Sequence, residues 1–330
     1  MRSRVLVAAG LAALTAMAVA CGTPDTPAAV VAPSQDAGTA PAADANILVV
    51  GMDAGPGREG SRPDTMVLVH VPKSGDSAAF VSLPRDLWVN GGKDFGQVKL
   101  NAVYSLGLAA EKRKAPGLPQ RQLVQKAQED LVRVVQDVTG VTIDHYAQTD
   151  MRGFADLSKV VGGVDVCLVN AVHDPNSGAN FPAGLQKVQG DAALAFVRQR
   201  HGLPNGDLDR VRRQQAFLTG LVTTVSNSGV LSSPAKVRAL LDAVRKYVVL
   251  DQRWDLVSFA KQVRGLNSAA VRTATVPVTG TNTQGSLTID PAAVKGFVHS
   301  FFAARPSKSD SQTMPPPPPA GGGAAAVCVN

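Results

Sequence analysis

Short apolar runs alternate along most of the chain with longer segments of helical period. The runs at residues 46–51, 65–71 and 78–84 are rich in Val, Ile, Leu and Phe, and each has the length of a buried strand. Segments 120–140 and 233–249 place apolar residues along one helical face, and a further helix is expected at about 207–225. Because strand and helix signals interleave, the pattern predicts an α/β fold with helices on both faces of a sheet.

Residues 1–21 have the pattern of an export signal. A basic start precedes an apolar run from Val5 to Ala20 that is too short for a comfortable membrane span. Small residues precede Cys21, as in lipoprotein processing, so we expect a lipid on Cys21; an uncleaved anchor and a plain secretory leader are the alternatives. All three place the folded part outside the membrane, at its outer face if it is anchored. The Ala- and Pro-rich residues 22–44 are predicted to be a flexible spacer.

A second low-complexity segment, residues 307–330, is rich in Pro, Gly and Ala and contains Cys328, so that residues 45–306 are expected to form the folded domain. Once Cys21 is set aside, Cys167 and Cys328 remain, and an even number of cysteines in an exported protein favours a disulfide. The alternative is a buried Cys167 and a free thiol at Cys328.

Composition argues against a disordered or nucleic-acid-binding chain. Of the 330 residues, 18% are charged and 45% hydrophobic, and the charged fraction lies below the usual ~25%. The formal net charge of +7 is modest and falls further if Arg2 and Arg4 are removed with the leader. The placement of the charges therefore matters more than their sum.

The densest charge cluster lies at residues 196–215 and contains His201 and five arginines: Arg198, Arg200, Arg210, Arg212 and Arg213. In an extended segment Arg198 and Arg200 would point the same way, and on a helix Arg210 and Gln214 would share a face. Guanidinium groups bind phosphate oxygens through several N–H donors, so the cluster predicts an anion site. The alternative is an exposed basic face paired with Asp207 and Asp209.

Carboxylates and further cations are expected at strand ends. Asp53 follows one predicted strand and Asp64 begins the next, and a pair of carboxylates without histidine suits Mg²⁺, with Mn²⁺ as an alternative. Asp64 could instead cap a turn or balance Arg62. Arg85 follows a third strand, and Lys99 lies in the motif VKLN. Together these groups predict a site for a phosphate diester or pyrophosphate. No P-loop or GxSxG motif and no zinc-ligand spacing is present in the sequence.

Several segments resemble, in order, the LytR-CpsA-Psr family of cell-wall assembly enzymes, in its actinobacterial type. They are NILVVGMD, SRPDTMVLVHV, FVSLPRDLWV, KLNAVYSLG, TGVTIDHYAQTDMRGFADLSKVVGGVDVCL and GLQKVQGDAALAFVRQRHGLPNGDLDRVRRQQAFL, and they cover roughly residues 46–225. The resemblance implies a three-layer α/β/α sandwich with a central mixed sheet. It also implies an extracytoplasmic phosphotransferase that moves a glycopolymer from a polyprenyl-pyrophosphate carrier to peptidoglycan, and nucleic acid is not an expected partner.

The resemblance also assigns roles to individual residues. Asp53 and Asp64 match the acidic pair beside Mg²⁺. The residues that match the pyrophosphate surroundings are Arg85, Lys99, Arg198, Arg200, Arg210 and Gln214, of which Arg85, Arg198 and Arg200 are expected to be catalytic together with the acidic pair. Asp207 and Arg213 belong to the same motif without an assigned role. A polyprenyl-pyrophosphate hydrolase and a non-enzymatic lipoprotein that binds anionic wall polymers are the alternative functions. Helices 120–138 and 231–249 are candidates to line an apolar groove for the polyprenyl chain, although such stripes are more often core.

Overall fold

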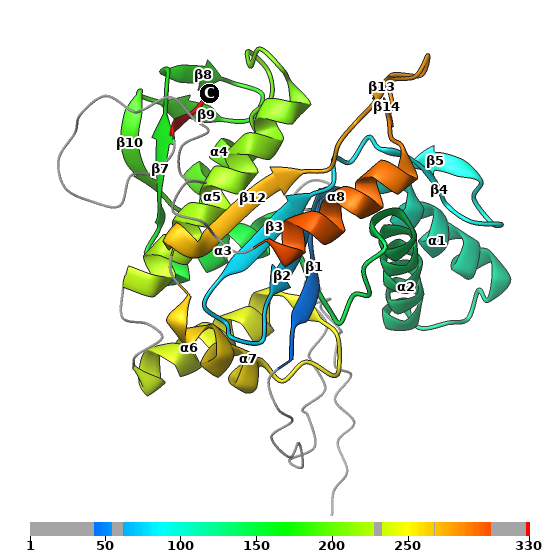
Figure 1. Cartoon of the computed structure of the whole chain (residues 1–330), viewed down its shortest axis with the longest axis horizontal. Helices are drawn as coiled ribbons and strands as arrows, with labels where there is room; N and C mark the ends of the chain where they lie inside the picture. Colours follow the sequence, from blue (N-terminus) through cyan, green and yellow to red (C-terminus); the bar gives the residue numbers. More distant parts are fainter. Residues whose placement is uncertain (1–42, 55–61, 228–232, 267, 305–327) are drawn as a thin grey trace, which may run out of the picture.

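A computed structural model describes residues 43–54, 62–227, 233–266, 268–304 and 328–330 (Figure 1). The predicted leader, its Cys21, most of the spacer and residues 307–327 lie outside these ranges. Within them, no helix combines the length and the apolar character that crossing a membrane requires.

Helices and strands are interspersed along the chain, as the apolar pattern predicts. The strands are β1 (Ala45–Met52), β2 (Pro63–Val71), β3 (Ala78–Ser82), β4 (Trp88–Asn90), β5 (Gln97–Lys99), β6 (His145–Thr149), β7 (Val164–Leu168), β8 (Val172–Asp174), β9 (Ala179–Phe181), β10 (Gly184–Val188), β11 (Val249–Leu250), β12 (Val271–Thr275), β13 (Gly280–Thr281), β14 (Leu287–Thr288) and β15 (Cys328–Val329). The helices are α1 (Leu100–Lys114), α2 (Gln120–Thr139), α3 (Met151–Val160), α4 (Asp191–Arg198), α5 (Asp207–Asn227), α6 (Pro234–Tyr247), α7 (Leu256–Gln262) and α8 (Pro291–Ala303), with short 3-10 turns at Val263–Gly265 and Ser268–Ala270.

Six strands form the central sheet in the order β11-β6-β1-β2-β3-β12. Strand β2 runs antiparallel to both β1 and β3, whereas β6 is parallel to β1 and β12 is parallel to β3. The sheet is therefore mixed, as the family resemblance implies. The antiparallel arrangement of β1 and β2 brings the end of one strand beside the start of the next.

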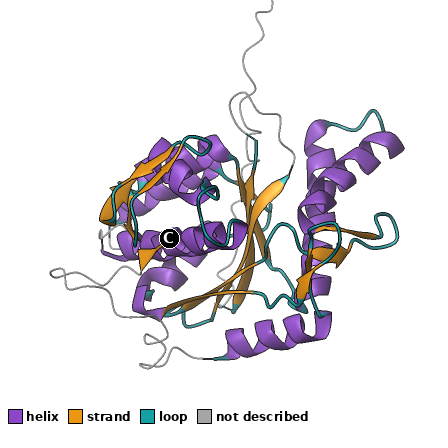
Figure 2. Cartoon of the chain, turned by 90° about the horizontal axis from the view of Figure 1, so that it is seen from above, coloured by secondary structure: helices purple, strands orange, loops and turns teal. Residues whose placement is uncertain are grey.

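Helices cover both faces of this sheet (Figure 2). On one face, Met66 and Leu68 of β2 join a core that includes Leu131 of α2 and Val294 of α8. On the opposite face, Val67 of β2 packs with residues of α5 and α7. Alternate residues of β2 thus enter different cores, which explains why that strand is apolar throughout. The structure confirms the α/β/α sandwich.

Helix ends follow local signals in the sequence. The Asp150 carboxylate accepts a hydrogen bond from the Gly153 backbone N–H at the start of α3, and Ser233 caps α6 in the same way. Helix α2 ends at Gly140, whose φ of 72° suits a residue without a side chain. Among the described side chains, the apolar stripe of α2 is buried in the core and therefore serves packing. Helix α6, by contrast, buries only Ala243.

A smaller sheet, β10-β7-β15, packs against α4 and α5. Its third strand is formed by Cys328 and Val329, which pair with Cys167 and Leu168 of β7. A disulfide joins Cys167 to Cys328, as the cysteine count predicted, across a sequence separation of 161 residues. The end of the described chain is therefore bound to the domain.

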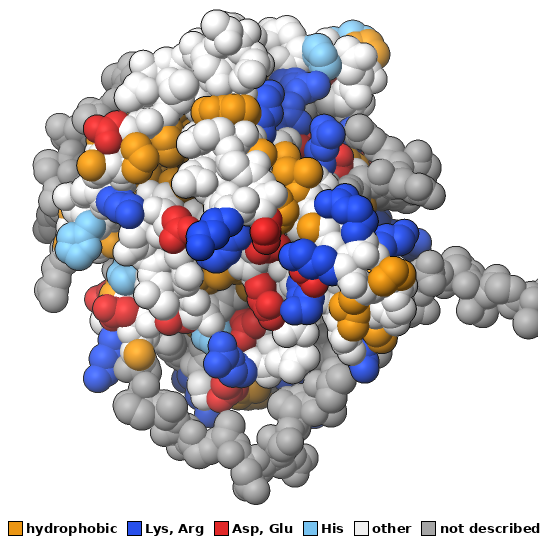
Figure 3. Space-filling model, turned by 90° about the vertical axis from the view of Figure 1, so that its right-hand side faces the viewer, with side chains coloured by type: hydrophobic (Ala, Val, Ile, Leu, Met, Phe, Trp, Pro, Cys, Tyr) orange, Lys and Arg blue, Asp and Glu red, His pale blue; other side chains and the backbone are white. Residues whose placement is uncertain are grey.

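The outer face at α1, α2 and the β4–β5 hairpin carries both signs of charge. Figure 3 shows acidic and basic side chains interspersed on this side of the molecule. At the end of α1, Lys114 Nζ lies 3.3 Å from Glu111 Oε1 and 3.7 Å from Asp94 Oδ2. On α2, Arg133 Nη2 lies 3.0 Å from Asp130 Oδ1. These cations are thus paired with carboxylates on their own face.

Candidate functional site

The predicted acidic pair lies where β1 and β2 meet. Asp53 directly follows β1, and Asp64 is the second residue of β2. The register shifts at this point, because Gly51 pairs with Thr65 while Met52 pairs with Pro63. This irregularity leaves Asp64 beside the last residues of β1 and places both carboxylates at one end of the central sheet.

Arg85, in the turn after β3, binds the Asp64 carboxylate directly. Its Nη1 donates a hydrogen bond of 2.9 Å to Asp64 Oδ2. On its other edge, Arg85 Nε lies 3.5 Å from Asp86 Oδ2 and 3.6 Å from Asp207 Oδ1. One guanidinium group therefore joins residues of β2, of the β3–β4 turn and of α5.

Lys99 enters the same network from the end of β5. Its Nζ donates to Asp86 Oδ1 at 2.8 Å. The backbone also connects these segments, because the Asn101 N–H donates to the Arg85 carbonyl. The structure thus brings together Arg85 and Lys99, as the sequence predicted.

Helix α5 supplies the remaining members of this ion network. Arg210 Nη2 lies 3.0 Å from Asp207 Oδ1 and donates to the Asp64 backbone carbonyl at 3.1 Å. One turn later, Gln214 Nε2 donates to Thr65 Oγ1 at 2.9 Å and to the Val197 carbonyl at 3.4 Å. Arg210 and Gln214 share a helical face, as predicted, and fasten α5 to β2 and to the end of α4.

Burial affects the two arginines of the network differently. Burial is the largest influence on the pKa of Arg85 and acts to lower it, but the Asp64 and Asp207 carboxylates outweigh it, so the pKa is raised. Arg210, whose side chain is 6% exposed, has a lowered pKa because desolvation dominates and the charges of Arg85 and Arg200 add to it. Both guanidinium groups remain charged at neutral pH.

The prediction of an extended segment carrying Arg198 and Arg200 was wrong. Arg198 is the last residue of α4, and the exposed Arg200 follows in the next loop. The segment is helical because Ala193, Ala195 and Phe196 pack into the small-sheet core, which selects a helical face. Arg200 remains in electrostatic range of Arg210, since its charge contributes to the lowered pKa of that residue.

Arg213 does not reach the ion network. Its side chain is fully buried, stacks over Phe196 and donates from Nε to the Asn330 carbonyl. Burial lowers its pKa to about 10. Arg212 Nη1 lies 2.6 Å from Asp209 Oδ1. The alternative interpretation of the arginine cluster, an exposed basic face paired with Asp207 and Asp209, therefore applies to Arg212.

Two residues of the network had no role in the sequence prediction. Asp86 joins Arg85 to Lys99, and Thr65 accepts the hydrogen bond of Gln214. The signal for Asp86 was its position next to Arg85 directly after a strand. No pattern in the sequence pointed to Thr65.

The acidic pair has the donor atoms that Mg²⁺ requires. Asp53 Oδ1 accepts a hydrogen bond from the Arg62 N–H at 3.0 Å, and Asp64 Oδ2 accepts one from Arg85 Nη1. Within the described residues, the second oxygen of each carboxylate has no hydrogen bond. Two carboxylate oxygens complemented by phosphate oxygens are a set that Mg²⁺ accepts. Among the described residues, no group of three or more His, Cys, Asp or Glu side chains forms a metal site from protein ligands alone.

The fold and the network together define an α/β/α protein with a network of alternating basic and acidic side chains at one end of its central sheet. The model of the LytR_cpsA_psr family matches residues 23–295. The chain therefore belongs to this family.

Individual relatives agree with this assignment. The chain is 45% identical over 258 residues to the cell wall biosynthesis protein LcpA of Corynebacterium glutamicum, covering 74% of this chain and 48% of that protein. It is 29% identical over 212 residues to the polyisoprenyl-teichoic acid–peptidoglycan teichoic acid transferase TagU of Enterococcus faecalis, covering 64% of this chain and 62% of that protein. The chain spans about half the length of the first curated relatives that it matches.

Solved structures have the same fold. TagV of B. subtilis superposes with a TM-score of 0.62 at 21% identity, over 80% of this chain and 99% of TagV. The LytR-Csp2A-Psr enzyme from Actinomyces oris gives a TM-score of 0.60 at 21% identity, over 84% of this chain and 98% of that enzyme.

Proposed function

We propose that this protein is a phosphotransferase that moves a glycopolymer from a polyprenyl-pyrophosphate carrier to peptidoglycan and forms a phosphodiester link. The observation that carries the proposal is the ion network in which Arg85 and Arg210 converge on Asp64 at the end of the central sheet. The name of the Enterococcus faecalis relative, a polyisoprenyl-teichoic acid–peptidoglycan teichoic acid transferase, supports it.

The charges of the site suit displacement at a phosphate. Arg85, Arg210 and Lys99 are held in place by hydrogen bonds and ion pairs within the protein before any substrate arrives. Fixed cations stabilise the negative charge that develops on phosphate oxygens without a cost of reorganisation. In the proposed step, a hydroxyl oxygen of the acceptor sugar attacks the phosphorus that carries the glycan. The bond from this phosphorus to the bridging oxygen breaks, and polyprenyl phosphate leaves.

The acidic pair serves the proton and the metal. Asp53 and Asp64 each have one oxygen that is oriented by a protein N–H and a second oxygen for another role. One of these oxygens accepts the proton of the attacking hydroxyl, because a carboxylate within reach of the hydroxyl is a competent base. Asp53 and Asp64 would also hold Mg²⁺, which when bound neutralises charge on the phosphates. Mn²⁺, which accepts similar oxygen ligands, would serve as a substitute.

The location that we propose is the outer face of the cell membrane. The leader with Cys21 supports anchoring by a lipid, and peptidoglycan as the acceptor requires an extracytoplasmic site. A lipid anchor would also hold the site near the membrane in which the polyprenyl donor is dissolved.

The test measures transfer by the full chain in detergent. The donor is a polyprenyl-pyrophosphoryl saccharide, and the acceptor is a peptidoglycan fragment, supplied with and without Mg²⁺. We expect metal-dependent transfer that is lost in Asp64→Asn and that falls about 10²-fold in Arg85→Ala, since one stabilising donor typically contributes that much. Matched controls are Asp242→Asn and Arg245→Ala on α6, whose exposed side chains pair with each other.

The outcomes separate the three candidate functions. Transfer that depends on Asp64 and on the acceptor supports the phosphotransferase. Phosphate release at the same rate without acceptor supports the hydrolase. Tight binding of a wall polymer that Asp64→Asn leaves intact, with no turnover, would replace both by the non-enzymatic binder.

A further inference from the structure

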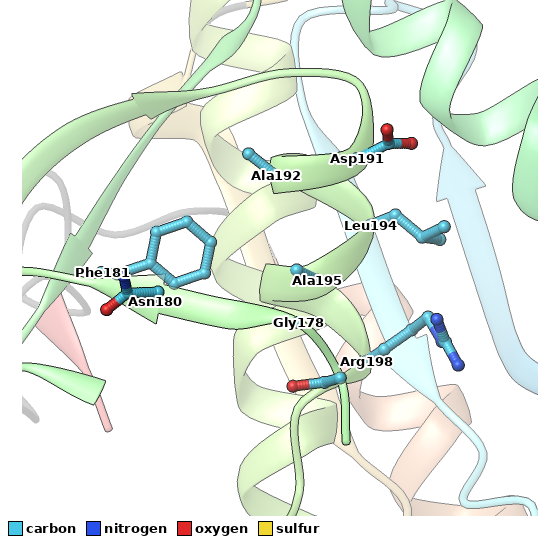
Figure 4. A pocket seen from close by; sticks show the side chains of 9 residues that line it. Gly178, Asn180, Phe181, Asp191, Ala192, Leu194, Ala195 and Arg198 are labelled. Atoms are coloured by element: carbon cyan, nitrogen blue, oxygen red, sulfur yellow. The ribbon is translucent and has the colours of Figure 1, made fainter. Parts of the chain in front are cut away.

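A groove of about 420 Å³ lies between α4 and the β8–β9 hairpin, and Arg198 is one of the residues that line it. Its floor is the helix face that carries Ala192 and Ala195, whose small side chains leave space above the helix. Figure 4 shows Asn180 and Phe181 of the hairpin on one side of this floor and Asp191, Leu194 and Arg198 on the other. The volume falls in the range of small-molecule sites. We call it the α4 groove.

Arg198 connects the α4 groove with the chain segment that borders the proposed phosphate site. Arg198, which lines the groove, is the residue that follows Val197, and the Val197 carbonyl accepts a hydrogen bond from Gln214 of the site. Arg200, two residues further on, acts electrostatically on Arg210. A group attached to a phosphate that Arg198 binds would therefore lie next to the groove.

The polar side chains of the groove suit hydroxyl groups. Asn180 and Asp191 are both exposed, and neither side chain has a hydrogen bond or ion pair with another described residue. An amide donates and accepts, and a carboxylate accepts, which together match the hydroxyls of a sugar. The negative charge of Asp191 disfavours a second phosphate there. A neutral ring with many hydroxyls is therefore the ligand that fits.

The hairpin wall is preorganised. The buried Asp174 carboxylate accepts hydrogen bonds from the Asn176 N–H at 3.0 Å and from the Ser177 hydroxyl at 2.7 Å. Phe181 packs edge-on against Phe196 of α4, with ring centroids 6.1 Å apart. A wall that is held in this way loses little conformational entropy when a ligand binds.

We propose that the α4 groove is a carbohydrate subsite for a sugar ring next to the phosphate at Arg198. This inference rests on the proposed function and adds a specificity site to it. The ligand class is an uncharged pyranose such as an N-acetylhexosamine. Both the glycan donor and the peptidoglycan acceptor carry such rings, and the test distinguishes them.

The first arm compares the affinity of the full chain for farnesyl pyrophosphate and for farnesyl-pyrophosphoryl-N-acetylglucosamine. In Ala192→Trp an indole occupies the floor of the groove, and Ala292→Trp, at the matching exposed second residue of α8, is the control. We expect the attached sugar to lower Kd about tenfold in the wild type and the control, and to leave Kd unchanged in Ala192→Trp. The Kd of farnesyl pyrophosphate should be equal in all three proteins. Asn180→Ala and Asp191→Asn, at exposed positions, should each remove part of this gain in affinity. They provide the test if Ala192→Trp fails to fold.

The second arm identifies the source of the sugar. If the affinity gain from the donor sugar is unchanged in Ala192→Trp but the KM for an uncharged peptidoglycan disaccharide rises at least about tenfold, the subsite holds the acceptor. If neither quantity differs between Ala192→Trp and Ala292→Trp while the wild type catalyses transfer, the subsite proposal is wrong and the proposed function stands.

A third measurement does not depend on turnover. Free N,N′-diacetylchitobiose should shift the side-chain amide resonance of Asn180 in the wild type and the control, and not in Ala192→Trp. Saturable shifts of this kind in a protein without transfer activity would support the subsite and reject the proposed function. Absence of the shifts, together with equal affinity for the sugar-bearing and sugar-free pyrophosphates, overturns the proposal.

Discussion

Removal of the Cys167–Cys328 disulfide is expected to cause a large loss of stability. The bond closes a loop with a sequence separation of 161 residues and holds β15 against β7. In the chain-entropy account, a loop of this length confines the unfolded chain enough to stabilise the fold by about 5 kcal/mol. Cys328→Ser removes the bond without altering Cys167, which is buried.

The expected change in melting temperature follows from the size of the domain. For 150–250 residues, 1 kcal/mol corresponds to about 2–4 °C, so the loss of about 5 kcal/mol should lower Tm by roughly 10–20 °C. The assay is thermal unfolding followed by circular dichroism, with and without a reducing agent. The wild type should respond to reduction, and Cys328→Ser should not.

Two results would refute this reasoning. A fall in Tm of less than about 2 °C would mean that the closed loop contributes little, as happens when the unfolded chain is already compact. Titration of two reactive thiols per chain in denatured but unreduced wild-type protein would mean that the bond does not form.

Three further predictions concern single positions. Arg210→Lys should reduce transfer by at least about tenfold with little change in Tm, because an ammonium group cannot bind Asp64 and an anion at once as a planar guanidinium can; transfer at the wild-type rate in Arg210→Lys would contradict it. Gly220→Ala should destabilise by about 1–3 kcal/mol in urea unfolding, because a Cβ there would lie 2.4 Å from the Asp165 carbonyl, a clash that exceeds the helix propensity gain of about 1 kcal/mol; equal or greater stability would show that α5 can shift away. Asp209 is buried, which acts to raise its pKa, but Asn205 and Arg212 outweigh burial and lower it below 3.8. Its contribution to stability is therefore complete above pH 3.8 and is lost as the pH falls through the folded-state pKa. The difference in unfolding free energy between wild type and Asp209→Asn should shrink over that acidic range, and a constant difference would contradict the assignment.

The apolar pattern was sufficient to predict the first three strands of the central sheet. The runs at 46–51 and 65–71 correspond to Ala45–Met52 and Pro63–Val71, since strands covered on both faces are apolar throughout. The run at 78–84 continues beyond the strand, which ends at Ser82. The small sheet was not predicted, because β15 is a strand of two residues whose position depends on a disulfide to a distant part of the chain.

The site shows more clearly where prediction from the sequence ends. The number of arginines predicts an anion, but it does not say which arginines are already neutralised within the protein. In the structure Arg85, Lys99 and Arg210 alternate with three carboxylates, Asp64, Asp86 and Asp207, so this network is close to electrical neutrality. A neutral network positions a phosphate well and attracts it weakly at long range. The excess positive charge that draws in a pyrophosphate must then come from groups beside the network. The exposed Arg200 is one such group, which is why its substitution should weaken donor binding more than that of Lys99.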